Sequence, residues 1–180
     1  MVHMVAVPEA SVSEPVVVAA TGRFAVPPSA RAVAITVHAA ELLYPGSDLV
    51  RLVGGFPEAE ILVVADRHGH GHGDPDDDDL DRAGQELRAD VARLGLSDLR
   101  LHRLGLPDPL PADADEDLVA ALSELIGFDP EPGVYCLAPA PEPGDPARAA
   151  VNRAAERVAQ VYGIPLLRYH CPQLAAAGRR

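Results

Sequence analysis

Short apolar runs alternate with helical segments along this sequence, and this alternation constrains the fold more than any other feature. Residues 32–37 (AVAITV) and 60–65 (EILVVA) are nearly continuous aliphatic runs, typical of strands buried on both faces of a parallel sheet. Similar runs follow at 98–106, 133–140 and 164–170. The pattern predicts a Rossmann-like, doubly wound α/β domain with a mainly parallel sheet flanked by helices.

The segments between these runs have the apolar spacing of amphipathic helices. The predicted helices cover 39–55, 79–95, 115–127 and 145–163. The first is interrupted at Pro45, and the last begins with Asp145 as N-cap and Pro146 at its first helical position. In such a sheet we expect the functional site beyond the carboxyl ends of the strands.

The chain of 180 residues, 48% of them hydrophobic, is long enough for one domain with its own core. We expect the domain to span 31–172. Residues 1–30, rich in Pro, Ser, Val and Ala, are expected to form an extended lead-in whose VVVAA run could add an edge strand, and 173–180 a disordered tail.

The net charge of −12 indicates what the chain does not bind. Its basic residues are all arginines without a clustered stripe, so nucleic acid and anionic membrane are poor partners. A small-molecule partner stays possible. Cys136 and Cys171 lie in no CxxC pattern. The stretch 1–20 lacks the cationic region typical of an export leader, and no long apolar segment is present. These features predict a cytoplasmic protein and leave its oligomeric state open.

The stretch RHGHGHGDPDDDD, residues 67–79, suggests a metal site because His68, His70 and His72 alternate with glycines beside an acidic run. The same composition fits a solvated insertion. Ordering each glycine costs backbone entropy, and alternate positions on an extended chain point to opposite faces. Both interpretations stay open.

His38 and Glu41 are three residues apart at a predicted strand-to-helix turn. An imidazole and a carboxylate at this spacing suit zinc or a similar divalent metal. In the structural alternative, Glu41 stabilises the positive end of a helix and His38 hydrogen-bonds there.

The strand AVAITVH followed by AAELL resembles the start of the PIG-L/LmbE-like deacetylases, whose first strand ends in a His-Pro-Asp-Asp-Glu motif. Five later segments follow in the family's order: EILVVAD, ELRADVARLG, LRLHRLGLPD, FDPEPGVYCLAPAP and IPLLRYH. The resemblance covers roughly residues 31–170 and implies a Rossmann-like fold with a zinc-dependent N-deacetylase site.

Within this resemblance, His38 matches a zinc-ligand histidine, and Glu41 falls where a ligand aspartate is expected. Ala40 falls at the general base, and Ala147 or a neighbour falls at the last ligand histidine. An alanine can neither accept a proton nor bind a metal, so the family's zinc-water mechanism cannot operate in its usual form.

Three hypotheses follow, and whether the chain is an enzyme stays open. The favoured one is a decayed zinc deacetylase centre that keeps a non-catalytic small-molecule or partner-binding role. The second is an active metal-dependent amide hydrolase for an N-acyl amino sugar or a similar small molecule. In this hypothesis the Asp66 carboxylate replaces the missing catalytic group, and the histidines of 68–72 complete the metal site. The third is a metal-handling, chelatase-like protein that uses the His/Asp-rich stretch. Asp108 could line the cleft, whereas His102, in mid-strand, is better explained as a pairing or core-rim residue than as a ligand.

Overall fold

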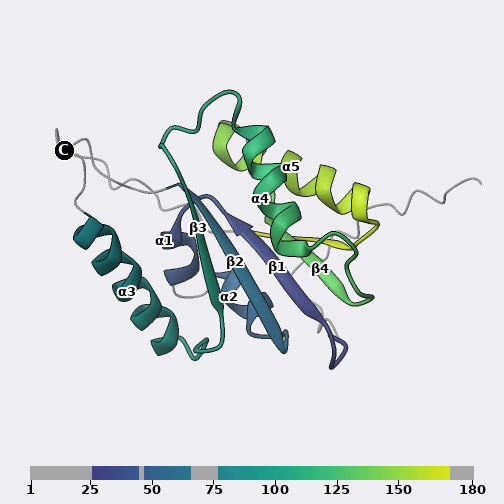
Figure 1. The fold of residues 1–180 in the computed structure, drawn as a ribbon, viewed down its shortest axis with the longest axis horizontal. Helices are drawn as coiled ribbons and strands as arrows, with labels where there is room; N and C mark the ends of the chain where they lie inside the picture. Colours follow the sequence, from purple (N-terminus) through teal and green to yellow (C-terminus); the bar gives the residue numbers. More distant parts are fainter. Residues whose placement is uncertain (1–25, 45–46, 66–76, 171–180) are drawn as a thin grey trace, which may run out of the picture.

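The computed structural model describes residues 26–44, 47–65 and 77–170, with the backbone alone for 77–83. It contains a five-stranded sheet in the order β3-β2-β1-β4-β5 (Figure 1). The strands are β1 (Arg31–Thr36), β2 (Glu58–Ala65), β3 (Arg100–Leu106), β4 (Val134–Pro139) and β5 (Leu166–Tyr169). All neighbouring pairs are parallel, which confirms the predicted α/β class.

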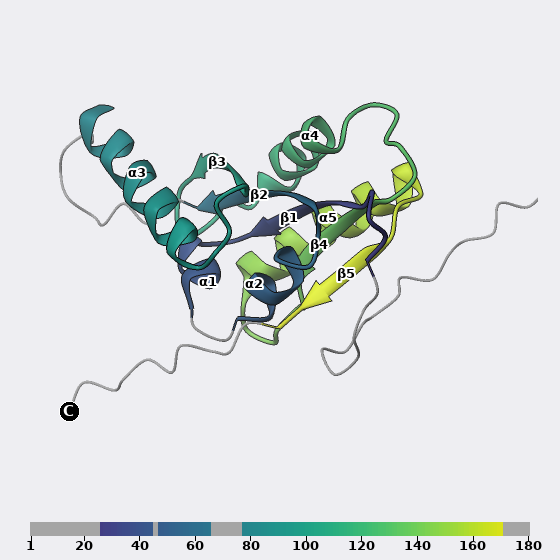
Figure 2. The ribbon, with the colours of Figure 1, turned by 90° about the horizontal axis from the view of Figure 1, so that it is seen from below.

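Helices cover both faces of this sheet. They are α1 (Ala39–Leu43), α2 (Asp48–Val53), α3 (Asp77–Arg93), α4 (Ala114–Ile126) and α5 (Pro146–Tyr162). On one face, Val33 and Ile35 of β1 pack in a core with α4 and α5. On the other, Ala32 and Ala34 pack with α1, α2 and Val91 of α3 (Figures 1 and 2). Side chains alternate along a strand, so a nearly continuous apolar run supplies both cores.

Helix boundaries follow the local signals in the sequence. The segment predicted as an interrupted helix forms the separate helices α1 and α2, and Ser47 caps α2 by accepting the Leu49 amide. Asp145 caps α5 by accepting the Arg148 amide at 2.9 Å, as predicted. α3 begins at Asp77, so the last part of the acidic stretch lies in its first turn. Negative charge there is favourable to the helix dipole.

The strand order defines a topological switch point between β1 and β4. From β1 the chain proceeds outward through β2 to β3, whereas from β4 it proceeds to β5 on the opposite side. The connections after β1 and β4 therefore run to opposite faces and leave the carboxyl ends of these strands as the expected ligand position.

The remaining expectations concern the two ends of the chain. Val26 packs against the core and Ala30 is buried, so the end of the expected lead-in contacts the domain. The expected VVVAA edge strand and the tail at 173–180 lie outside the described residues.

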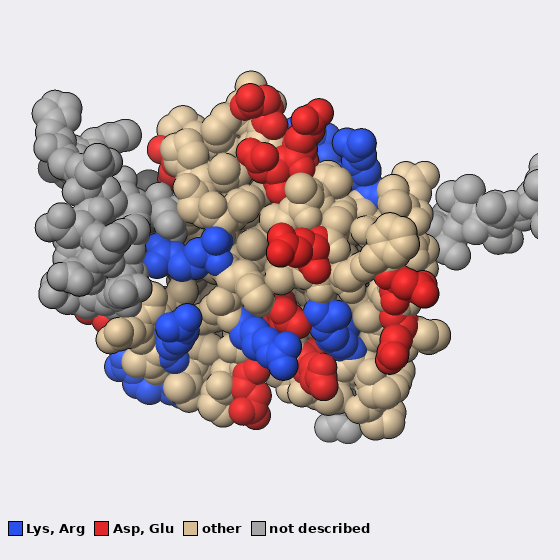
Figure 3. All heavy atoms as spheres, in the orientation of Figure 1, with Lys and Arg blue, Asp and Glu red and all other residues tan. Residues whose placement is uncertain are grey.

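None of the helices in the described ranges is long and apolar enough to cross a membrane. Acidic and basic side chains are interspersed on the face drawn in Figure 3.

Candidate functional site

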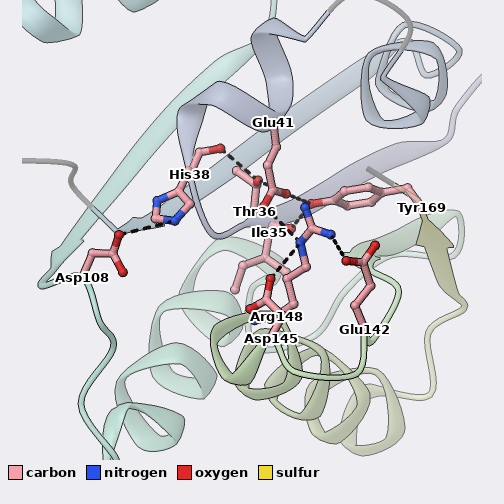
Figure 4. Close-up of polar contacts among 9 residues, drawn as sticks. All are labelled: Ile35, Thr36, His38, Glu41, Asp108, Glu142, Asp145, Arg148 and Tyr169. Atoms are coloured by element: carbon pink, nitrogen blue, oxygen red, sulfur yellow. Dashed lines mark hydrogen bonds and ion pairs between the residues drawn. The ribbon is translucent and has the colours of Figure 1, made fainter. Parts of the chain in front are cut away.

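Glu41 lies at the centre of a polar network at the carboxyl end of the sheet (Figure 4). Its carboxylate accepts a hydrogen bond from the Thr36 hydroxyl at 2.7 Å and lies 3.3 Å from the Tyr169 hydroxyl. Arg148 Nε is 3.5 Å from Glu41 Oε1, and the two side chains are only 11% and 9% exposed. A buried carboxylate requires such compensation, because desolvation penalises its charged form.

The switch point explains why these four residues meet. Thr36 ends β1 and Tyr169 ends β5, so both lie at the same edge of a parallel sheet. Glu41 is in the first turn of α1, directly after β1, and Arg148 is in the first turn of α5, directly after the β4 connection. The network therefore joins both halves of the doubly wound fold.

Arg148 also binds the connection between β4 and α5. Its Nη1 lies 2.9 Å from Glu142 Oε2, and its Nε lies 3.5 Å from Asp145 Oδ2. One guanidinium thus faces three carboxylates, Glu41 included. A planar cation with several N–H donors suits this arrangement, because it can bind carboxylates in several directions at once.

His38 forms a second contact at the same edge. Its Nε2 is 3.6 Å from Asp108 Oδ2, longer than a direct hydrogen bond, and its Nδ1 is buried without a hydrogen-bond partner among the described residues. His38 occupies the N-cap position of α1, but its side chain makes no capping hydrogen bond, so the expectation that it hydrogen-bonds at the helix start is wrong for the side chain. The pair presents an imidazole and a half-exposed carboxylate to a ligand at the sheet edge.

The described residues do not fit the zinc centre that the family resemblance implies. The imidazole of His38 points to Asp108, whereas the carboxylate of Glu41 points to Arg148 and Tyr169 (Figure 4). In the ranges that the structure describes, no three His, Cys, Asp or Glu side chains are grouped so that they could hold a metal ion.

The other predicted site residues fall into two groups. Asp66, His68, His70 and His72 lie outside the described residues. Ala40 in α1 and Ala147 in α5 are helical and half-buried, and Ala147 is the neighbour of Arg148.

Sequence reasoning did not single out Arg148, Glu142, Thr36 or Tyr169. One signal was available for Arg148. A cation in the first turn of a helix is unfavourable to the helix dipole unless acidic groups compensate it. Arg148 stands in that turn beside Glu142 and Asp145.

A separate polar cluster surrounds Glu60 on the α4 face of the sheet. Its side chain, 8% exposed, lies 2.8 Å from Arg31 Nη2 and 2.8 Å from His102 Nε2, with Arg100 Nη1 at 3.6 Å. Burial by itself would raise the pKa of Glu60, but hydrogen bonds from Arg31 and His102 hold that pKa below its ordinary value. Within this cluster His102 pairs with the Glu60 carboxylate, which is one of the two structural roles, pairing or core-rim, expected from the sequence.

No protein-family model matches the chain, and no curated protein does. Several solved structures are similar to this chain, among them the following two. The conserved protein TT1542 from Thermus thermophilus has a TM-score of 0.54 and 21% identity over 81% of this chain and 68% of that one. GalB, the 4-carboxy-2-hydroxymuconate hydratase from Pseudomonas putida, has a TM-score of 0.51 and 16% identity over 75% of this chain and 60% of that one. At these identities the similarity establishes the fold alone.

Proposed function

We propose that this chain is a PIG-L/LmbE-like protein in which the zinc deacetylase centre has decayed, and that it binds a small molecule or a protein partner without catalysing its turnover. The binding region is the carboxyl edge of the sheet at the switch point. The observation that carries the proposal is that the Glu41 carboxylate already contacts the side chains of Arg148, Thr36 and Tyr169.

The electrostatics of Glu41 support this interpretation. In the resemblance, Glu41 stands at a metal-ligand position, and a ligand carboxylate needs an oxygen lone pair directed at the ion. Here its Oε2 accepts a 2.7 Å hydrogen bond and its Oε1 faces a guanidinium. A divalent cation at this carboxylate would be repelled by the charge of Arg148 within a few ångströms.

The alanine at the position of the general base supports the same conclusion. Ala40 stands where the resemblance places that base, and its methyl group cannot take a proton from water. The partly exposed groups at the edge are His38, Asp108, Glu142 and Asp145. These groups can hydrogen-bond hydroxyl or amine groups of a ligand, and this is the basis for expecting binding without hydrolysis.

The first test is the metal content of untagged protein after dialysis, for the parent and for His38→Ala. We expect substoichiometric zinc in both, and no acetate release from N-acetylglucosamine or a similar N-acyl amino sugar. About one zinc ion per chain, lost in His38→Ala and accompanied by acetate release, would contradict the proposal and favour the active hydrolase.

A second variant tests the metal-handling hypothesis. Replacement of His68, His70 and His72 by serine removes the imidazoles of the 67–79 stretch and leaves the sheet edge intact. Zinc that is retained by the parent and by His38→Ala, but lost in this variant, would assign metal binding to the stretch.

A further inference from the structure

We infer that the amino end of the sheet, on the face covered by α4 and α5, is an interface with a second copy of this chain, and that Phe128 anchors it. This amino-end surface consists of Phe128, Val161, Arg100, Asp129 and Glu131. It lies at the end of the strands opposite to the candidate site, so the inference goes beyond the proposed function and does not depend on it. A dimer formed through this surface leaves the carboxyl edge of the sheet open.

Two large apolar side chains of the amino-end surface are exposed to solvent. Phe128, just after α4, is 98% exposed, and Val161, in the last turn of α5, is 73% exposed. The helices of a parallel α/β fold run opposite to its strands, so α4 and α5, which pack against each other, both end at the amino end of the sheet (Figures 1 and 2). Aromatic side chains are enriched at the centres of protein interfaces, and covering these two side chains removes apolar area from water.

The loop that carries Phe128 is held at both of its ends by Arg31. The side chain of Arg31 donates a hydrogen bond from Nη2 to the Leu125 carbonyl at 2.6 Å, and its backbone amide donates one to the Gly133 carbonyl at 3.0 Å. The guanidinium is in turn held by the buried Glu60 carboxylate at 2.8 Å. A loop that is already fixed loses little conformational entropy when a partner binds, and this lowers the cost of association.

The charges of this surface are divided into two parts of opposite sign. Basic side chains stand at the starts of two strands, Arg31 in β1 and Arg100 in β3, and Arg100 is 73% exposed. The loop 127–133 carries Asp129 and Glu131, both exposed, and no basic residue. Figure 3 shows basic and acidic side chains close together on this face.

This division of charge identifies a second copy as the partner. In a dimer with two-fold symmetry the same patch meets itself, so the basic part of one copy can face the acidic loop of the other in both directions. An exposed phenylalanine alone is ordinary on a protein surface. Here it stands on a fixed loop next to charges that complement their own two-fold image.

The test is sedimentation equilibrium of full-length, untagged protein at physiological ionic strength, which screens the long-range repulsion between chains of net charge −12. We expect the parent to reach the mass of two chains below about 100 μM, because interfaces of ordinary size bind in the micromolar range or more tightly. Phe128→Ser should raise the dissociation constant at least about tenfold. The ring is almost fully exposed in the single chain, so its loss leaves the fold intact.

Leu94→Ser is the matched control. Leu94 is an exposed apolar residue directly after α3, and α3 packs on the opposite face of the sheet, so this variant should have the mass of the parent. Arg100→Glu should weaken association, and the addition of Asp129→Arg should restore it. A parent that stays monomeric over the whole range, a dimer that Phe128→Ser leaves unchanged, or charge reversal without restoration overturns the inference.

A fluorescence measurement distinguishes a second copy from other means of covering Phe128. The chain contains no tryptophan, so Phe128→Trp introduces a single indole reporter. Its emission maximum should move to shorter wavelength as the protein concentration rises, because association buries the ring. A short-wavelength maximum in the monomer would mean that residues of the same chain cover the ring, and this result overturns the inference. A long-wavelength maximum at every concentration overturns it as well.

Discussion

The hydroxyl of Tyr169 donates a hydrogen bond to the backbone carbonyl of Ile35 at 2.9 Å, across the intervening strand β4. The same hydroxyl lies 3.3 Å from Glu41 Oε2. One buried phenol thus ties the edge strand β5 to the end of β1 and to the polar network at the switch point. The stability of the fold and the geometry of the candidate site are coupled through this contact.

Tyr169→Phe should lower the free energy of unfolding by about 1–2 kcal/mol, because the buried Ile35 carbonyl loses the hydrogen bond that the Tyr169 hydroxyl donates to it. Urea denaturation monitored by circular dichroism measures the change. Tyr162→Phe is the matched control, since its half-buried ring packs against the core and its residue lies at the end of α5, away from the carboxyl ends of the strands. Equal effects of the two substitutions would mean that the Tyr169 hydroxyl contributes nothing specific.

Glu60→Gln should destabilise the protein at pH 7 by about 2 kcal/mol, because the variant loses charge-assisted hydrogen bonds from Arg31 and His102. The pKa of Glu60 in the folded state is below its ordinary value of 4.5. Its stabilising contribution is therefore fully present above that ordinary value and is lost as the pH falls through the lower, folded pKa.

The corresponding measurement is the unfolding free energy of both proteins from pH 7 downward. The difference between parent and Glu60→Gln should shrink below about pH 4.5, the ordinary value for this carboxyl group. A difference that stays constant down to acid pH would show that the charge of Glu60 is not the source of the effect.

Asp145→Ala should cost about 1 kcal/mol through the loss of the N-cap of α5, and should also weaken the hold on Arg148. Asp113→Ala is a close control, because Asp113 occupies the N-cap position of α4 but makes no side-chain capping hydrogen bond. Chemical denaturation of both variants measures how much unfolding free energy each substitution removes. A loss at Asp113 as large as that at Asp145 would argue against the capping explanation.

Cys136 should resist thiol reagents in the native protein, because burial raises the pKa of its thiol to about 12. A Cys171→Ser background removes the second thiol. In that background, the Cys136 thiol should react with an aromatic disulfide at pH 8 only as fast as unfolding exposes it. Rapid stoichiometric labelling under native conditions would contradict the buried position of Cys136 in β4.

Ala40→Asp with Ala147→His restores the two side chains that the family resemblance lacks. We expect this double variant to stay free of zinc while Arg148 is present, and to retain about one zinc ion per chain when Arg148→Met is added. Elemental analysis after dialysis is the measurement. Stoichiometric zinc in the double variant alone would show that Arg148 does not keep metal from this edge.

Local signals in the sequence determined the elements of this protein and their class. The continuous apolar runs at 32–37 and 60–65 became β1 and β2, buried on both faces, and the Asp145–Pro146 pair marked the start of α5. These predictions succeeded because burial periodicity and helix capping depend on neighbours in the chain.

Only the tertiary structure decided which side chains meet at the site. His38 and Glu41 are close in sequence, yet they turn to different partners, Asp108 and Arg148, which lie about 70 and 107 positions further along the chain respectively. The parallel register and the divergence of the chain at the switch point bring these partners to one edge. A motif with the local spacing of a metal site therefore has its carboxylate held by an arginine, because long-range charge compensation depends on the fold and not on local spacing.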